Sequence, residues 1–367
     1  MIRKSYLAYL KKAITEQGLL RATKYPFRYL GTYLGYKLNK SVSGPIQGTL
    51  CITYNCNLRC EMCDLPQRHQ SFKEDGKSPY KFAEWKKIIK SFADIGTSGM
   101  AISGGEPFLN KDLFPIIREI KKQKMVCQMT TNGWFIDEVS GRELIETGID
   151  TITISIDGSD PELHDKIRGI SGSFEKALKA VRTLVLLRNE MKANFKINIS
   201  TVFGKSNYKN IDKIIDITKN AGADCIGFIP VHTIAPEVKK DLSLLTILET
   251  EEIKEVISSL ITKSKEDNYI ETSESYLNMF YDFFGGKPLP MSCLAGFTTL
   301  IIDCYGDIFP CFSFYEMKKS WGNLKEFNDL NEFWKSHSVE LSRSEIKECR
   351  ECFWNCQVET NLLYKIP

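Results

Sequence analysis

The chain has 367 residues, of which 43% are hydrophobic and 26% charged, and its formal net charge is +3. These values are typical of a soluble globular protein and exclude a disordered or fibrous one, and the length allows more than one domain. No apolar run approaches the roughly 18 residues of a membrane span. Lys11 and Lys12 interrupt the N-terminal apolar stretch too early for a secretory signal. We therefore expect a cytoplasmic protein whose twelve cysteines bind metal or do chemistry rather than form disulfides.

The first 40 residues are strongly basic. They contain nine Lys or Arg against one acid, Glu16, a balance of +8, so the rest of the chain carries −5. Apolar and aromatic residues follow helical spacing over residues 2–13, and Pro26 is placed to start a second helix. Two interpretations stay open. The helices pack on the outside of the protein with their lysines in water, or they lie on an anionic membrane surface.

The middle of the chain alternates between predicted strands and helices. Six β-branched or apolar runs read as strands, at residues 48–54, 98–103, 125–131, 151–157, 195–203 and 225–231. Helices are predicted from Ser78-Pro79 onward and over 111–123, 142–147, 173–191 and 210–221. Such alternation predicts an α/β fold with a parallel sheet, and six units suit a partial (β/α)6 TIM-type barrel.

Composition changes after this alternation. Residues 244–284 read as helical, and from residue 290 onward short strands, turns and cysteines follow. We place a boundary near Gly286 and predict three parts: a basic helical extension over 1–47, the barrel with its helical connection over 48–285, and a small cysteine-rich domain over 286–367.

Three cysteines follow the first predicted strand, at Cys56, Cys60 and Cys63. In a parallel barrel the reactive groups lie on the loops after the strands, which is where this C-x3-C-x2-C run falls. Cys51 lies roughly 16 Å upstream along the strand, so we interpret it as a core thiol. Three thiolates suit a soft metal centre, and an iron–sulfur cubane that normally takes four leaves one iron open. The missing ligand predicts a place for a substrate or cofactor.

The run from Cys56 to Cys63 resembles the signature of the radical S-adenosylmethionine (SAM) superfamily, with Met62 where an aromatic residue is frequent. The resemblance implies that Cys56, Cys60 and Cys63 hold a [4Fe-4S] cluster whose open iron is chelated by the methionine group of SAM. It also implies that the reduced cluster cleaves SAM to a 5′-deoxyadenosyl radical, which abstracts hydrogen from the substrate.

Further segments resemble the same superfamily. Gly104, Gly105 and Glu106 follow the second predicted strand like the family's GGEP motif, which implies that Glu106 accepts a hydrogen bond from the SAM ammonium. A plain strand-to-helix turn is the alternative. The segment after the fourth strand implies that Ser155 and Arg168 contact the cofactor, or else that Arg168 is a solvated helix residue. Residues 132–133 are either a further contact or only a turn.

Six more cysteines fall after residue 292, in an order that resembles the SPASM or twitch domains that add auxiliary clusters to radical enzymes. Two clusters need eight thiolates, so we expect one auxiliary [4Fe-4S] cluster. Cys293 and Cys311 are expected to ligate it from either side of a hairpin turning at residues 305–307, while Cys304 is a packed thiol. Two more ligands are expected from the last three cysteines, with the first two preferred: Cys349, Cys352 and Cys356. A zinc ribbon remains an alternative for this second site.

These features predict a radical SAM enzyme whose auxiliary cluster accepts an electron or anchors the substrate, with reduced flavodoxin or ferredoxin as electron donor. The substrate is a small molecule or, if the basic extension binds membrane, a lipid. A peptide or protein maturase is the alternative. Only 47 residues precede the first predicted strand, so a leader peptide would need a separate binding partner. A non-catalytic iron–sulfur or zinc protein is a third interpretation, but such a protein would not need a turn that binds an ammonium group. Nucleic acid is not expected, because the basic character is local.

Overall fold

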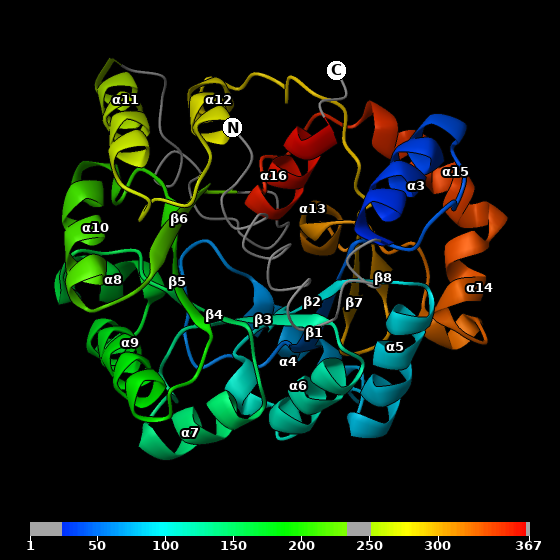
Figure 1. The fold of residues 1–367 in the computed structure, drawn as a ribbon, viewed down its shortest axis with the longest axis horizontal. Helices are drawn as coiled ribbons and strands as arrows, with labels where there is room; N and C mark the ends of the chain where they lie inside the picture. Colours follow the sequence, from blue (N-terminus) through cyan, green and yellow to red (C-terminus); the bar gives the residue numbers. More distant parts are fainter. Residues whose placement is uncertain (1–23, 233–250, 365–367) are drawn as a thin grey trace.

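The protein is built around one twisted sheet of eight strands. The computed structural model describes residues 24–232 and 251–364. Within them the strand order is β6-β5-β4-β3-β2-β1-β7-β8, and neighbours from β6 to β7 are parallel. Figure 1 shows the strands as an arc. Their bounds are β1 Gln47–Thr53, β2 Gly99–Gly104, β3 Val126–Thr131, β4 Thr151–Ser155, β5 Lys196–Phe203 and β6 Cys225–Pro230, then β7 Thr299–Asp303 and β8 Ile308–Phe309. The predicted α/β fold with six parallel strands of a partial barrel is confirmed.

Helices cover the convex side of this arc (Figure 1). They are α5 Phe82–Asp94, α6 Leu113–Lys122, α7 Glu138–Glu146, α9 Ser173–Glu190 and α10 Ile211–Asn220. Helix α5 illustrates why these segments fold as they do, because Trp85, Ile88, Ile89 and Phe92 recur at helical spacing and are all buried. Strand β1 is buried at every residue from Gly48 to Ile52, as expected for a central parallel strand covered on both faces.

The C-terminal region extends the barrel sheet. Strand β7 pairs with β1 in parallel register, Gln47 opposite Thr299, and β8 folds back antiparallel to β7. The predicted hairpin is confirmed, and its turn residue Gly306 has φ +94°, where an added Cβ would lie 2.1 Å from the Tyr80 hydroxyl oxygen. The sheet therefore continues across the sequence boundary that we predicted near Gly286.

One helix start was predicted wrongly. Helix α5 begins at Phe82 rather than at Ser78-Pro79. The Tyr80 amide donates to the Cys304 carbonyl oxygen at 2.7 Å, which draws this segment along the hairpin turn. The Phe82 amide donates to the Asp112 carboxylate at 2.9 Å, so the first helical N–H groups find their partner only there.

The remaining helices surround the ends of the sheet. Helix α3, Lys24–Leu38, contains Pro26 in its first turn, as predicted for the second N-terminal helix, whereas the predicted helix over residues 2–13 lies outside the described residues. Among the described helices, none is long and apolar enough to cross a membrane. The others are α4 Leu65–Glu74, α8 Pro161–Arg168, α11 Glu251–Glu266, α12 Glu274–Phe284, α13 Phe312–Glu316, α14 Leu330–Lys335, α15 His337–Glu348 and α16 Asn355–Tyr364.

Candidate active site and iron–sulfur ligands

The first group of cysteines lies on the loop that joins the C-terminal end of β1 to α4. Cys56, Cys60 and Cys63 are all half-buried on this loop. Burial, with a smaller contribution from the neighbouring Cys60, raises the pKa of the Cys56 thiol to about 11 and that of Cys63 to about 12. Because each thiol is within electrostatic reach of the others, the three sulfurs form one local group that a bound metal centre would deprotonate.

This cysteine loop is tied to the end of helix α8 by its backbone. The Arg59 amide donates to the Arg168 carbonyl at 3.1 Å, and the Glu61 amide donates to that of Ile167 at 3.0 Å. Gly169 ends α8 with φ +74°, and a Cβ there would lie 2.1 Å from the Arg59 carbonyl oxygen. The loop between Cys56 and Cys63 is therefore positioned by a helix more than 100 residues later in the chain.

Arg168 is a largely buried member of the site, with its side chain 11% exposed, and not the solvated helix residue that the sequence left open. Its guanidinium forms an ion pair of 2.6 Å with Asp157, a fully buried carboxylate, and donates to the Cys60 sulfur at 3.8 Å. The second oxygen of Asp157 accepts from the Val202 amide at 2.8 Å. Arg168 Nε is buried and has no hydrogen-bond partner among the described residues, which leaves one donor for a ligand.

Glu106 is buried and accepts three hydrogen bonds. One carboxylate oxygen accepts from the Thr131 hydroxyl at 2.7 Å and the Phe108 amide at 3.2 Å, and the other accepts from the Asn132 amide at 2.9 Å. A carboxylate has about four acceptor sites, so Oε2 keeps one lone pair for a further donor. Burial raises the pKa of this carboxyl to about 7, although the three donors act against that rise.

Gly104 and Gly105 face the chain that leaves β1. A Cβ at Gly104 would lie 2.3 Å from the Thr53 carbonyl oxygen, and one at Gly105 would lie 2.1 Å from that of Asn55. The Gly105 and Glu106 amides donate to these same two carbonyls, at 2.7 and 2.8 Å. The glycines thus let the end of β2 press against the start of the cysteine loop, which fixes Glu106 relative to it.

The sequence left open whether Asn132 is a further contact or only part of a turn. The structure gives it several hydrogen-bond partners. Its side-chain amide donates to the Asn57 side-chain oxygen at 2.9 Å, while its own oxygen accepts from the Trp134 amide at 2.9 Å. Its backbone amide reaches Glu106. Residue 132 therefore connects the cysteine loop to Glu106, and the signal that pointed to it was its place directly after β3.

Ser155 lies at the last position of β4, paired with Ser200 of β5, and is half-buried. The carboxyl ends of parallel strands meet at one edge of a sheet. The cysteine loop follows β1, Glu106 follows β2, Asn132 follows β3, and Ser155 ends β4. The structure therefore brings the predicted residues to that same edge.

The second group of cysteines gathers where α13 and α15 meet the β7–β8 hairpin. Cys293 and Cys311 belong to one buried cluster, Cys311 directly precedes α13, and Cys349 ends α15. Burial raises the pKa of Cys293 and of Cys311, and Cys352 and Cys349 raise both further. These four thiols are therefore close neighbours, while Cys356 is half-buried in the first turn of α16.

The described His, Cys, Asp and Glu side chains include no group of three or more arranged around a single ion. A four-iron cluster holds each ligand on a different iron, so its thiolates surround a volume instead of meeting at a point. The two cysteines interpreted as core thiols are indeed buried in the main core, Cys51 with no exposed surface and Cys304 with 1%.

Comparison with known families decides the class of this protein. A family model described as the radical SAM superfamily matches residues 50–218, and one described as the SPASM iron–sulfur cluster-binding domain matches residues 293–356. The chain belongs to the radical SAM superfamily. The two matched ranges contain both cysteine groups. SAM and a [4Fe-4S] cluster are the cofactors of this family, and the SPASM region binds auxiliary iron–sulfur clusters.

Individual relatives differ in what they make. The AdoMet-dependent heme synthase of Oleidesulfovibrio alaskensis is 25% identical over 272 residues, 71% of this chain and 68% of that protein. The PqqA peptide cyclase of Granulibacter bethesdensis is 29% identical over 180 residues, 49% of this chain and 46% of that protein. The crystal structure of Streptococcus suis SuiB bound to S-adenosylmethionine matches with a TM-score of 0.67 at 20% identity, covering 92% of this chain and 79% of that one. Because the sequence identity to SuiB is 20%, this similarity concerns the fold.

In this radical SAM SPASM enzyme, Arg68 of α4 joins the two cysteine regions. Its Nε donates to the Asp64 carboxylate at 2.7 Å, one residue beyond Cys63. Its two terminal nitrogens donate to the carbonyl oxygens of Tyr315, at 2.6 Å, and Glu316 at the end of α13. Because α13 starts directly after Cys311, a single buried guanidinium sets the position of one cysteine region relative to the other.

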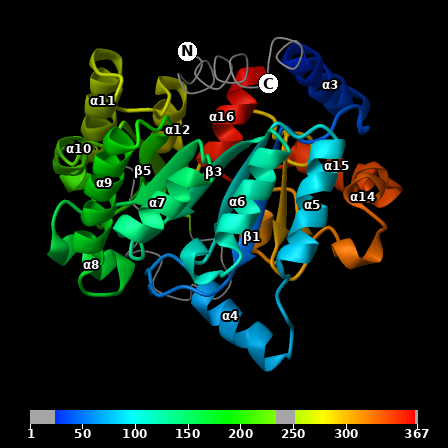
Figure 2. The ribbon, with the colours of Figure 1, turned by 60° about the horizontal axis from the view of Figure 1, so that its bottom comes forward.

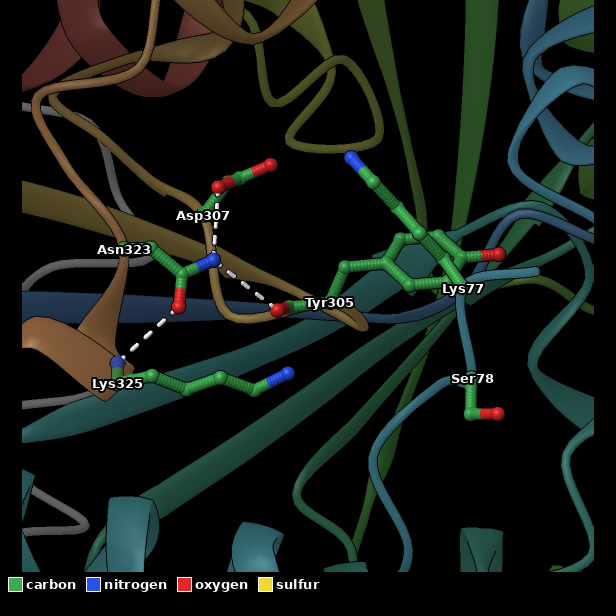
Figure 3. Close-up of a pocket in the computed structure, with 6 residues that line it drawn as sticks. All are labelled: Lys77, Ser78, Tyr305, Asp307, Asn323 and Lys325. Carbon is green, nitrogen blue, oxygen red and sulfur yellow. Dashed lines mark hydrogen bonds between the residues drawn. The ribbon is translucent and has the colours of Figure 1, made fainter. Parts of the chain in front are cut away.

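A small pocket lies at the tip of the β7–β8 hairpin, on the same edge of the sheet as the cysteine loop. Figure 3 shows its lining: Lys77, Ser78, Tyr305, Asp307, Asn323 and Lys325. The Asn323 amide fixes one wall by donating to the Tyr305 carbonyl at 3.1 Å and to Asp307 at 2.8 Å. Lys77 Nζ lies 4.4 Å from the centre of the Phe72 ring and Lys325 Nζ 5.5 Å from that of Tyr80, so the pocket holds two ammonium groups beside the Asp307 carboxylate.

Proposed function

We propose that the enzyme binds SAM at a [4Fe-4S] cluster held by Cys56, Cys60 and Cys63 and removes a hydrogen atom from a substrate at the C-terminal edge of the barrel. The supporting observation is that Glu106, after β2, and Arg168, at the end of α8, reach the cysteine loop from different elements, each with hydrogen-bonding capacity that no described residue uses. A purely structural loop has no need of either unused group.

Different residues of this edge would bind different groups of SAM. Oε2 of Glu106 would accept from the ammonium group, and Arg168 would offer its Nε–H and its positive charge to the carboxylate, with Ser155 at the end of β4 as a further contact. When bound, the reduced cluster supplies the electron that cleaves SAM to a hydrogen-abstracting radical. Arg168 also donates to the Cys60 sulfur, which stabilises the thiolate form that a cluster requires.

For the auxiliary site we propose one [4Fe-4S] cluster on Cys293, Cys311, Cys349 and Cys352, with Cys356 as the rival for a C-terminal ligand. The effects of Cys349 and Cys352 on the thiol pKa values of Cys293 and Cys311 support this choice. A cluster there would accept an electron from a substrate radical or hold the substrate. The connection through Arg68 would keep its position fixed relative to the first cluster.

The substrate proposal is a molecule with a carboxylate or another anionic group, held by Lys77 and Lys325 at the hairpin tip. Both a small molecule and a peptide satisfy this chemistry, and relatives are named for both classes. Reduced flavodoxin or ferredoxin would supply electrons.

Reductive cleavage of SAM tests the proposal. Anaerobically reconstituted protein, reduced with dithionite, is expected to convert SAM to 5′-deoxyadenosine and methionine. The matched variant Cys51→Ser changes a core cysteine in β1, the strand that leads into the cysteine loop, and should keep cleavage if it folds. Cys60→Ser should lose it. Cleavage by Cys60→Ser at the wild-type rate would contradict the assignment.

A further inference from the structure

Helix α3 carries an apolar stripe that is exposed among the residues that the structure describes. Phe27, Leu30, Leu34 and Leu38 are 74%, 51%, 40% and 61% exposed. Their spacing of three and four residues places them along one side of the helix. We call these four residues the α3 stripe.

The stripe is not a consequence of a loosely attached helix. The opposite side of α3 is buried, with Gly31, Thr32, Gly35 and Tyr36 turned into the protein. A Cβ at Gly35 would lie 2.7 Å from the Lys40 carbonyl oxygen, and Tyr36 packs edge-on against Phe297 at 5.6 Å between ring centres. The helix is therefore docked by one side and presents the other to solvent.

Exposed apolar side chains are concentrated here. Of the nine large exposed hydrophobic residues among the described parts of the chain, six fall between residues 27 and 42. The other three, Val139, Leu186 and Leu341, are scattered on separate helices. Scattered residues are ordinary, whereas a contiguous apolar surface marks an interaction site.

The charge around the stripe indicates its partner. Helix α3 contains no Asp or Glu, and Lys37 and Lys40 are exposed beside the stripe. The first 40 residues together hold nine Lys or Arg against one acid. An apolar stripe flanked by cations complements an anionic lipid surface, in which the side chains enter the acyl boundary and the ammonium groups meet the headgroups. We infer that the α3 stripe docks this enzyme on an anionic membrane surface.

The location of α3 separates docking from catalysis. Arg28 donates to Ser98, which precedes β2, so α3 lies at the N-terminal edge of the sheet. The cysteine loop follows the C-terminal end of the seven-residue β1, about 20 Å along the strand. Figure 2 shows α3 and α4, which follows the cysteine loop, at opposite ends of the molecule. Docking therefore leaves the catalytic edge open to water, and it does not require the lipid substrate that the sequence suggested.

Vesicle sedimentation of the full chain tests this inference. The test variant Leu30→Gln/Leu38→Gln removes apolar surface from the stripe without changing charge. Its control, Leu186→Gln/Leu341→Gln, removes exposed leucines of similar exposure, 69% and 59%, from other helices. Wild-type and control proteins should sediment with vesicles of equal parts phosphatidylglycerol and phosphatidylcholine and not with phosphatidylcholine alone. The stripe variant should bind about tenfold more weakly or worse.

Other results would overturn the inference. Equal vesicle binding of the stripe variant and the wild type would assign the binding to another part of the chain, and no binding of either would remove the membrane as partner. A wild-type dimer that the stripe variant dissociates, without vesicle binding, assigns the stripe to a second copy of the chain. SAM cleavage in vesicle-free buffer should be the same in all three proteins, so failure of docking and failure of the proposed enzymatic function give different results.

Discussion

Replacement of Glu106 by glutamine is the sharpest test of how SAM is held. The substitution keeps the size of the side chain and removes its charge. In the wild type, Oε1 accepts from Thr131 and Phe108, and Oε2 accepts from Asn132 with one lone pair left for the SAM ammonium. A charge-assisted hydrogen bond is worth about 1.5–3 kcal/mol, so Glu106→Gln should weaken SAM binding roughly ten- to a hundredfold. Anaerobic calorimetric titration of the reconstituted protein measures this change.

The control for this substitution is Thr131→Val, which removes one neutral donor to the same carboxylate and leaves its charge. It should weaken binding by less than about tenfold, because a neutral hydrogen bond contributes about 1 kcal/mol. If Glu106→Gln binds SAM as tightly as wild type, or if both variants lose the same affinity, Glu106 only holds the turn together and the reasoning is refuted.

The same carboxyl predicts a pH dependence. Burial raises the pKa of Glu106 to about 7, and only the carboxylate form accepts from the ammonium. Below that pH a proton must leave before SAM binds, so wild-type affinity should fall about tenfold per pH unit as the pH drops below 7. Above it the affinity should be flat. Glu106→Gln should show no such slope between pH 5.5 and about 7.

Three further outcomes follow from the site. Gly105→Ala should lower the free energy of unfolding by about 2 kcal/mol in urea, because its Cβ would lie 2.1 Å from the Asn55 carbonyl, and unchanged stability would contradict this contact. Cys352→Ala should retain about four irons and Cys356→Ala about eight. If instead Cys356→Ala retains about four and Cys352→Ala about eight, Cys356 and not Cys352 is the auxiliary ligand. Arg168→Lys keeps the charge but not the planar fork and should bind SAM about tenfold more weakly, with binding at wild-type affinity counting against the cofactor contact.

Local patterns were enough to predict the barrel. The six β-branched runs and the helical spacing between them depend on short stretches of sequence, so strands such as β5, with strict alternation of burial, appeared where expected. The hairpin at Gly306 was also predictable, because a turn that needs positive φ favours glycine. Cys51 and Cys304 were correctly assigned to the core, since Cys51 lies within a strand and Cys304 has no counterpart in the domains that the sequence resembles.

Contacts between distant segments were not predictable in this way. The parallel pairing of β7 with β1 joins residues about 250 positions apart, and no local pattern specifies that register. The ion pair of Arg168 with Asp157 depends on how α8 folds back over the end of β4. Helix α4 was missed because its short, polar sequence has little apolar periodicity, and Arg68 within it acquires its role only from the carbonyls of α13.

Iron content combined with SAM cleavage tests the central claim most directly, that two separate groups of cysteines hold two clusters and only the first acts on SAM. Reconstituted wild-type protein should contain about eight irons per chain and cleave SAM when reduced. The variant Cys56→Ala/Cys60→Ala/Cys63→Ala should contain about four irons and cleave none. A triple variant that keeps all its iron, or a wild-type protein that is fully active with zinc and without iron, would contradict the account.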